Sequence, residues 1–154
     1  MSPGGLQVRP AREQDLSSII DIDLLVSQGD RRERRFTDLV LAQDCQSGRV
    51  LVALVDGKVC GFLAYQLVLD CATILDVTVH PDSRRRGIAT ALMKTAIDEM
   101  RSKGAARCEL EVRVSNIGAI ALYDAFNFSK DGVRADYYPL GQGREDGLLM
   151  SLEL

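Results

Sequence analysis

The stretch 75–100 constrains the fold of this chain more than any other, because a strand, a basic turn and a helix follow one another within it. Residues 75–79, Leu-Asp-Val-Thr-Val, alternate apolar and polar side chains with the period of a β-strand. His-Pro-Asp-Ser at 80–83 ends this strand, because proline cannot donate to a sheet and fixes its own φ angle. From Gly87 onward, apolar residues recur as on the buried face of a helix, at Ile88, Leu92, Met93, Ala96, Ile97 and Met100.

The turn before this helix has the chemistry of an anion-binding site. The first amides of a helix have no acceptor within the helix, and the helix dipole places partial positive charge there. Gly87 allows a ligand to approach the backbone closely, and Arg84, Arg85 and Arg86 add three positive charges beside it. We therefore expect the turn to bind a phosphate or pyrophosphate group. The alternative is a solvent-exposed basic turn that only caps a core helix.

Length and composition limit the kind of anion. The chain has 154 residues, which predicts a single domain spanning 1–154 with a proper hydrophobic core. Hydrophobic residues make up 46% and charged residues 27%, as in an ordinary globular protein. The formal net charge of −3 provides no overall positive field that would recruit nucleic acid. A small anionic ligand is therefore favoured over a polyanion, and no direct nucleic-acid role is expected.

Cysteine and histidine usage gives no sign of a metal site. The four cysteines are widely spaced, and His80 is the one histidine, so zinc is not expected. Cys60 and Cys108 fall within apolar strand patterns and are expected to be buried thiols. The start of the chain lacks a signal-peptide pattern, and no apolar run is long enough to cross a bilayer. We expect a cytoplasmic protein.

The N-terminal half is expected to supply antiparallel strands and two helices. Asp56-Gly57 between two apolar runs is among the strongest hairpin signals in a sequence. The polar segment 27–35 is rich in arginine; its role stays open between a solvated helical face and a substrate lip. The expected elements are strands at 6–9, 49–55, 59–69 and 72–79, a helix at 11–25 and a second, short helix at 36–46.

The C-terminal half predicts a parallel strand followed by a hairpin. The strand at 107–114 has one apolar and one charged face, and the intervening helix makes it parallel to the strand at 72–79. Ser115-Asn116 offers an N-cap for the next helix. The remaining expected elements are a helix at 87–103 ending at Gly104, a helix at 118–126, and strands at 128–138 and 147–154 around a loop at 139–146.

Several motifs together resemble the GNAT acetyltransferases. Arg84-x-x-Gly87-x-Ala89 is similar to the acetyl-CoA signature of that family. The chain also resembles its bacterial ribosomal-protein-alanine N-acetyltransferase (RimI-like) members at Leu-Glu-Val-Arg-Val-Ser-Asn (110–116), Ala-Ile-Ala-Leu-Tyr (119–123), Tyr-Tyr-Pro (137–139) and Glu-Asp (145–146). The resemblance implies an α/β (α+β) GNAT fold, with a mixed, mostly antiparallel sheet of six to seven strands flanked by about four helices.

The chain departs from the pattern of these enzymes in places. Ala89 stands at the second glycine position, and Phe126-Asn127-Phe128 replaces a glycine before the phenylalanine. The aromatic Pro-Trp segment usual near the acceptor site is absent; Gln28 begins an arginine-rich segment instead, and there is no tryptophan. The acetyl donor is therefore better defined than the acetyl acceptor.

The resemblance implies where acetyl-CoA binds, without any metal. The amine attacks the thioester directly in a ternary complex. The amides of Val77, Thr78 and Val79 are expected to polarise the thioester oxygen. Asn116 is expected to contact the pantetheine and cap its helix. The pyrophosphate is expected at the turn formed by Arg84, Arg85, Arg86, Gly87, Ile88, Ala89 and Thr90.

Two side chains are candidates for proton transfer. Glu111 matches the general base of the RimI-like enzymes, and Tyr123 matches the general acid for the leaving thiolate. Structural alternatives are an exposed Glu111 paired with Arg113 or Arg107, and a Tyr123 that serves as a core aromatic. His80 is assigned no role.

The acceptor remains open between several classes. A protein N-terminus, such as a ribosomal-protein alanine, is favoured because an α-amine has a pKa near 8, against about 10.4 for lysine. A small amine or a lysine is the alternative within the same chemistry. A non-catalytic acetyl-CoA-binding module and an RNA-contacting domain are the competing classes. The expected assembly is a monomer or weak dimer.

Overall fold

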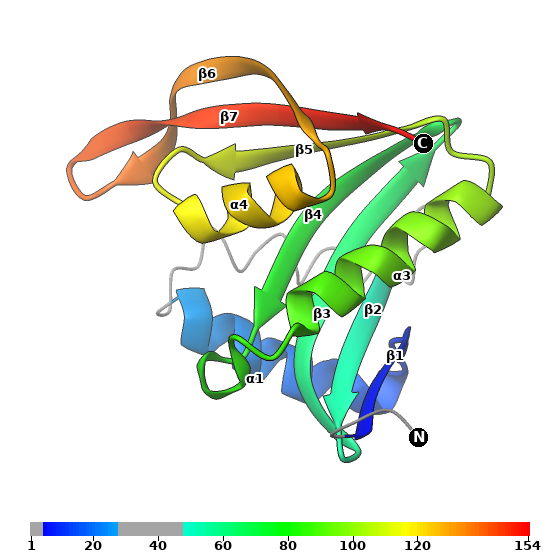
Figure 1. Ribbon diagram of the computed structural model, residues 1–154. Helices are drawn as coiled ribbons and strands as arrows, with labels where there is room; N and C mark the ends of the chain where they lie inside the picture. Colours follow the sequence, from blue (N-terminus) through cyan, green and yellow to red (C-terminus); the bar gives the residue numbers. More distant parts are fainter. Residues whose placement is uncertain (1–4, 28–47) are drawn as a thin grey trace.

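The computed structural model describes residues 5–27 and 48–154. Seven strands form one sheet in the order β1-β2-β3-β4-β5-β7-β6, as the expected fold class requires (Figure 1). Neighbouring strands are antiparallel except β4 and β5, which are parallel as predicted. The strands are β1 (Leu6–Pro10), β2 (Gly48–Val55), β3 (Lys58–Val68), β4 (Cys71–Val79), β5 (Arg107–Arg113), β6 (Ser129–Leu140) and β7 (Gly143–Glu153).

Three α-helices and two 3-10 helices accompany the sheet in the described ranges. The expected helix at 36–46 lies outside the described residues, as does the arginine-rich segment from Gln28 onward. About four helices were expected, and three of them can be compared here. The helices are η2 (Glu13–Asp15), α1 (Leu16–Ser27), η3 (Pro81–Ser83), α3 (Ile88–Ser102) and α4 (Ile117–Ala125).

The sheet is covered on both faces, so its core has two parts (Figure 1). On one face, α1 buries Ile19 and Ile22 against Val52 and Phe62 of the sheet. On the other face, α3 and α4 pack together with the larger cluster. The predicted apolar face of α3 is buried at every position named above: Ile88, Leu92, Met93, Ala96, Ile97 and Met100.

The N-terminal helix is divided, unlike the continuous helix expected at 11–25. Residues 13–15 form the 3-10 helix η2, and α1 begins at Leu16. Asp15 is buried, and its carboxylate accepts from Nη1 and Nη2 of Arg9, at 2.7 and 3.1 Å, and from the Arg12 amide at 2.7 Å. These bonds fix a separate first turn, which periodicity alone does not reveal.

The C-terminal hairpin is longer than predicted. A loop was expected at 139–146, but β6 continues to Leu140 and β7 starts at Gly143. Gly141 takes a positive φ of 58°, which permits a tight turn. Pro139 is tolerated in β6 because this is an edge strand, where a missing donor costs no ladder bond. The prediction of a loop was therefore wrong.

The sheet opens between β4 and β5. Their parallel pairing includes only four residue pairs and ends at Ile74 opposite Leu110. Beside this point the register of β3 against β4 slips between Ala64 and Tyr65, so that Leu75 is an extra residue in β4. β4 and β5 then continue to Val79 and Arg113 without pairing to each other. Within the described ranges, no helix is long and apolar enough to cross a membrane.

Candidate active site

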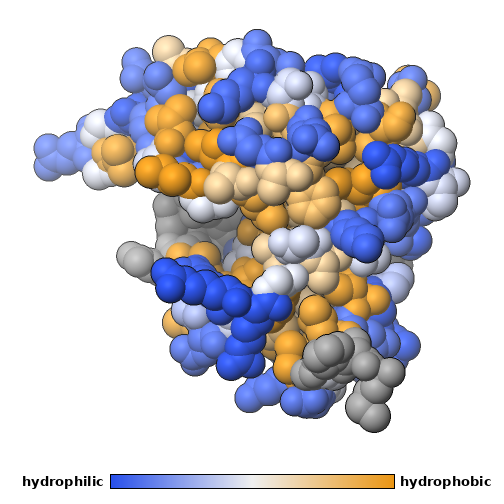
Figure 2. All heavy atoms as spheres, viewed as in Figure 1, coloured by the Kyte–Doolittle hydropathy of each residue, from blue (hydrophilic) through white to orange (hydrophobic). Residues whose placement is uncertain are grey.

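A cleft of about 1000 Å³ lies where β4 and β5 separate. The β4 residues Ile74 to Thr78 and the β5 residues Leu110 to Arg113 form its walls. α4 and the β6–β7 hairpin contribute Tyr123, Tyr137 and Tyr138, and α1 contributes Asp23. Figure 2 shows a hollowed surface with many hydrophobic side chains between α4 and α3 on the face drawn. The cleft therefore combines apolar side chains with many charged and polar groups, among them Asp76, Glu111 and Arg134.

The alternation of β5 brings Glu111 to this cleft. Cys108, Leu110 and Val112 are buried in the core, and Glu109 and Glu111 lie on the opposite face of the strand, where both line the cleft. The Glu111 side chain is 28% exposed, and its Oε1 lies 3.3 Å from Nη2 of Arg134. A carboxylate in this position can accept a proton from a group bound in the cleft.

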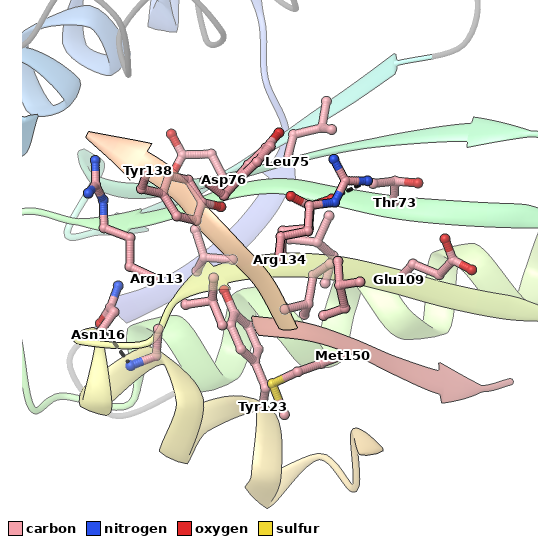
Figure 3. Close-up of a pocket in the computed structure, with 18 of the residues that line it drawn as sticks. Thr73, Leu75, Asp76, Glu109, Arg113, Asn116, Tyr123, Arg134, Tyr138 and Met150 are labelled. Carbon is pink, nitrogen blue, oxygen red and sulfur yellow. Dashed lines mark hydrogen bonds and ion pairs between the residues drawn. The ribbon is translucent and has the colours of Figure 1, made fainter. Parts of the chain in front are cut away.

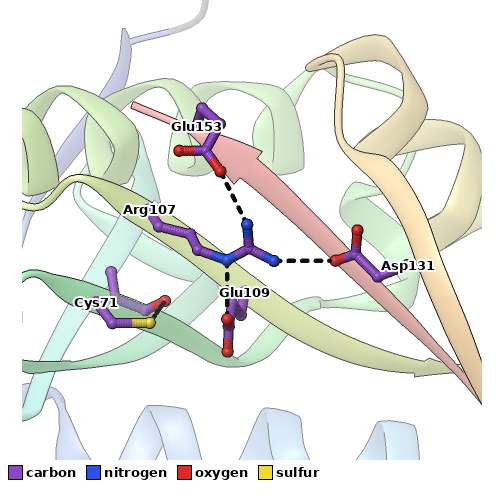
Figure 4. Close-up of polar contacts among 6 residues, drawn as sticks. Cys71, Arg107, Glu109, Asp131 and Glu153 are labelled. Carbon is purple, nitrogen blue, oxygen red and sulfur yellow. Dashed lines mark hydrogen bonds and ion pairs between the residues drawn. The ribbon is translucent and has the colours of Figure 1, made fainter.

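The arginines that the sequence suggested as partners of Glu111 pair with other acids. Arg107 contacts Glu109 at 2.9 Å, Glu153 at 2.8 Å and Asp131 at 3.3 Å (Figure 4). Arg113 contacts Glu145 at 3.1 Å. The cation that meets Glu111 comes instead from β6, far along the chain.

Tyr123 is both a core residue and a residue of the cleft. Its side chain extends from α4, with Tyr138 and Asp76 across the cleft (Figure 3). It is only 6% exposed, and its ring centroid lies 5.8 Å from that of Phe128. Burial, with the nearby Asp76 carboxylate, raises the pKa of Tyr123 well above its usual range. The phenol therefore keeps its proton over the whole physiological pH range.

Asn116 begins α4 as the sequence predicted. Its side-chain oxygen accepts a hydrogen bond from the Ala119 amide at 3.2 Å. Asn116 also lines the cleft, so that capping the helix and contacting a bound ligand are compatible.

The basic turn opens the helix α3 with two left-handed residues. Arg85 and Gly87 have φ angles of 65° and 73°. In the first hydrogen bond of the helix, the Ala91 amide donates to the Gly87 carbonyl at 3.0 Å. The amides of 88–90 come before this bond and have no acceptor within the helix. Arg84, Arg85 and Arg86 are exposed, and nothing lies within 4 Å of the position that a Cβ on Gly87 would take. These features fit a pyrophosphate at this turn.

The cleft does not include every residue predicted for the cofactor. Val77, Thr78 and Asn116 line it together with Glu111 and Tyr123. The remaining predicted residues lie outside its lining: Val79, Arg84, Arg85, Arg86, Gly87, Ile88, Ala89 and Thr90. Val79 is the last residue of β4, and the other seven follow it in the chain, in the turn and the first residues of α3.

Sequence reasoning assigned no role to an aromatic group on the hairpin. The Tyr137 and Tyr138 rings meet edge to face, with centroids 4.9 Å apart. The Arg113 guanidinium lies 4.7 Å from the Tyr138 centroid. A Cβ on Gly147 would lie 3.0 Å from Cε2 of Tyr138, so the missing side chain allows this close approach. A glycine within a predicted strand, such as Gly147, is the sequence signal that could have indicated this close approach.

A buried carboxylate ties the hairpin to the start of α4. Glu145 is 8% exposed, and its Oε1 accepts from Ser115 Oγ at 3.0 Å and from Arg113 Nη1 at 3.1 Å. The Ser115 bond and the Arg113 charge hold the pKa of Glu145 below its usual range. Arg113 also donates to the Pro139 carbonyl at 2.7 Å. These contacts fix one rim of the cleft.

The described residues give no indication of a metal centre. In the ranges 5–27 and 48–154, no three histidine, cysteine or acidic side chains are grouped to hold a metal ion. Cys60 and Cys108 are buried free thiols, as expected from their strand patterns.

Comparisons with known proteins agree with this architecture. The family model described as "Acetyltransferase (GNAT) family" matches residues 14–128. The [ribosomal protein bS18]-alanine N-acetyltransferase of Escherichia coli is 43% identical over 99 residues, which are 64% of this chain and 67% of that protein. An N-alpha-acetyltransferase of Saccharolobus solfataricus is 31% identical over 160 residues, covering 96% of this chain and 92% of that protein.

A solved structure extends the likeness to nearly the whole chain. The crystal structure of the ribosomal-protein-S18-alanine N-acetyltransferase from Escherichia coli superposes with a TM-score of 0.82 at 30% identity. It covers 96% of this chain and 93% of that chain. The chain therefore belongs to the GNAT family and is an acetyl-CoA-dependent N-acetyltransferase.

Proposed function

We propose that this chain transfers the acetyl group of acetyl-CoA to the α-amine of a protein N-terminus. The observation that carries the proposal is the cleft beyond Ile74 and Leu110, which is lined by both a carboxylate, Glu111, and a phenol, Tyr123. The names of the two relatives support it, since one specifies an alanine of ribosomal protein bS18 and the other an α-amine. A ribosomal-protein alanine is the acceptor that we propose.

Glu111 acts as the general base in this proposal. An amine attacks only when it is neutral, so a proton must leave it before or during the reaction. With a pKa near 8, roughly a tenth of an α-amine is neutral at pH 7, whereas lysine, at about 10.4, is neutral in far less than one molecule in a hundred. Glu111 accepts the proton directly or through one water, which favours an N-terminus as the nucleophile.

The start of α3 and the free part of β4 hold the donor. Acetyl-CoA supplies an activated thioester when bound. The amides of Ile88, Ala89 and Thr90 and the charges of Arg84, Arg85 and Arg86 bind its pyrophosphate. Successive amides of a strand point to opposite edges, so among Val77, Thr78 and Val79 those that face away from β3 donate to the thioester oxygen. Asn116 binds the pantetheine arm.

Tyr123 completes the proton transfer. Because its raised pKa keeps the phenol protonated, it holds a proton at Oη for the sulfur that leaves. The route is direct transfer in a ternary complex and includes no metal and no acetylated residue of the protein.

We propose further that residues 1–154 act as one cytoplasmic domain, as a monomer or weak dimer. The family match runs from 14 to 128 and includes Glu111 and Tyr123, which supports one functional unit. Sedimentation of the purified chain measures its state directly; a tight oligomer contradicts this part of the proposal.

A panel of acceptors tests the substrate class. The chain is incubated with acetyl-CoA and three probes: an alanine-initiated peptide, the same peptide with a blocked N-terminus and an internal lysine, and spermidine. Mass spectrometry then locates the added acetyl group. The proposal predicts fastest acetylation of the free α-amine. Acetylation of spermidine or lysine with no reaction at the free N-terminus contradicts it and selects the small-amine or lysine alternative.

A further inference from the structure

We propose that Arg134 is a positioning residue for acetyl transfer, which holds the Glu111 carboxylate in place while Tyr137 holds Arg134. The inference rests on the proposed role of Glu111 as general base and goes beyond it, because it assigns the group that keeps this base in its working position. Arg134 points into the cleft from the edge strand β6 (Figure 3).

The strand register explains how an edge-strand side chain reaches β5. Arg134 pairs with Gly147 of β7, and Gly147 pairs with Arg113 of β5. The space over Gly147 is occupied by the Tyr137 and Tyr138 rings, which lie 3.4 and 3.0 Å from the position that a Cβ on Gly147 would take. Glu111 lies one position further along the same face of β5, opposite Leu149. The Arg134 guanidinium reaches across β7 and meets the Glu111 carboxylate at 3.3 Å.

A second contact holds the arginine from its own strand. The register of β6 against β7 slips between Arg134 and Tyr138, and the chain there includes Asp136 with a φ of 51°. The Tyr137 ring then lies under the guanidinium, with its centroid 5.0 Å from Cζ. A planar guanidinium can stack on a ring and bind a carboxylate simultaneously, which a lysine ammonium does less well.

The arrangement leaves part of the carboxylate available. The Arg134 contact is to Oε1 of Glu111, and we assign Oε2 to the proton taken from the acceptor. Glu109, two residues earlier on the same face, has a different environment, since its arginine also binds Glu153 and Asp131. Glu111 and Arg134 thus form one pair, whereas Glu109, which also lines the cleft, shares Arg107 with two other carboxylates.

The contact of Arg134 with Glu111 is expected to raise the rate of acetyl transfer and to contribute little to folding. A general base contributes roughly 10²- to 10⁴-fold only when it lies within hydrogen-bond reach of the proton it removes. Without Arg134, the Glu111 carboxylate loses this contact and is expected to rotate among several rotamers. The Arg134 side chain is 52% exposed, so its removal leaves the fold intact.

Kinetics of matched variants test the inference. Arg134→Ala is compared with Arg134→Lys and with Arg144→Ala, an exposed arginine of the same hairpin outside the cleft lining. The acceptor is the fastest of the three probes above. We expect kcat to fall roughly tenfold in Arg134→Ala and less in Arg134→Lys, with an unchanged KM for acetyl-CoA and no effect of Arg144→Ala.

A double-mutant cycle with Glu111→Gln separates positioning from a general structural role. If Arg134 acts through Glu111, adding Arg134→Ala to Glu111→Gln costs no further activity. An additive loss, or an undiminished kcat in Arg134→Ala, overturns the inference. Full activity of Glu111→Gln alone overturns the proposed base instead, so the two failures are distinguishable.

A structural readout needs no acceptor. Crystal structures of the unsubstituted protein and of Arg134→Ala are compared at Glu111. We expect one rotamer in the first and several in the second. The same single rotamer in both structures contradicts the inference even if the kinetics change.

Discussion

Ile74 and Leu110 are the last paired residues of the parallel β4–β5 ladder, and the cleft opens directly beyond them. Parallel strands that separate within a sheet expose backbone amides and carbonyls, which a bound molecule can satisfy. Leu75 follows immediately as the extra residue of β4. The proposed catalytic groups, Glu111 and Tyr123, line this opening from β5 and α4.

Replacing Glu111 by glutamine tests the base directly. Glutamine has nearly the same shape but cannot take a proton at neutral pH, so we expect kcat to fall roughly 10²- to 10³-fold. Acetyl-CoA binding, measured by calorimetry, is expected to stay within about twofold. Glu109→Gln is the matched control on the same face of β5, and it is expected to retain most of the activity. A large loss in the control with none in Glu111→Gln would reverse the assignment.

The pH dependence of turnover tests Tyr123. Burial raises the pKa of this phenol, and a general acid works only while it is protonated, so the raised pKa extends its working range to higher pH. We expect no alkaline fall in kcat from Tyr123 below about pH 10, the usual pKa of tyrosine. Tyr123→Phe should lower kcat at every pH. An alkaline limb near pH 8 that disappears in Tyr123→Phe would contradict this account.

Removing the positive charges before α3 should weaken donor binding more than chemistry. In the triple variant Arg84→Ala, Arg85→Ala and Arg86→Ala, we expect the Kd for acetyl-CoA to rise roughly tenfold, or about 1.4 kcal/mol. The kcat at saturating acetyl-CoA should change little, because these side chains lie outside the cleft lining. Salt should weaken binding to the unsubstituted protein more than to the variant. Arg101→Ala, at the other end of α3, serves as control.

The ionised Glu145 carboxylate, at the rim of the cleft, is expected to stabilise the folded state. Its pKa in the folded state is lowered, first by the Ser115 hydrogen bond and then by Arg113. The resulting stabilisation is present above the unfolded-state pKa, near 4.3, and is lost as the pH falls through the lower folded-state value. Glu145→Gln should therefore lower the Tm at pH 7, and this difference should shrink below about pH 4.

An exposed glutamate provides the comparison for this stability measurement. Glu153 is paired with Arg107, but its side chain is 78% exposed. Exposed ion pairs contribute little to stability, so Glu153→Gln should change the Tm less than Glu145→Gln at pH 7. A difference for Glu145→Gln that grows on acidification would contradict the assignment of a lowered pKa.

Local patterns predicted the elements that depend on local physics. The alternation in β5 and the helical period of α3 each follow from one buried face, and both were confirmed. The start of α3 at Gly87 was predicted from the change of apolar period there, and Gly87 is the N-cap of this helix. The parallel pairing of β4 and β5 was also predicted, since a helix connects them.

Features that depend on register between distant strands could not be predicted. The extra residue Leu75 exists only in relation to β3, and the contact of Arg134 with Glu111 depends on the register of β6 and β5 against β7, the strand between them. The sequence placed Glu111 on a charged face but named the wrong arginines as its partners. Neighbours in the chain are natural first guesses for an ion pair, whereas a sheet joins residues from distant segments.

A crystal structure with bound coenzyme A tests the central claim most directly. The account predicts the pyrophosphate against the amides of 88–90 and the pantetheine arm in the opening between β4 and β5. It also predicts that the sulfur lies close to Tyr123 Oη and on the same side as Glu111. Coenzyme A bound elsewhere, with the opening beyond Ile74 and Leu110 empty, would contradict both the donor site and the proposed catalytic roles.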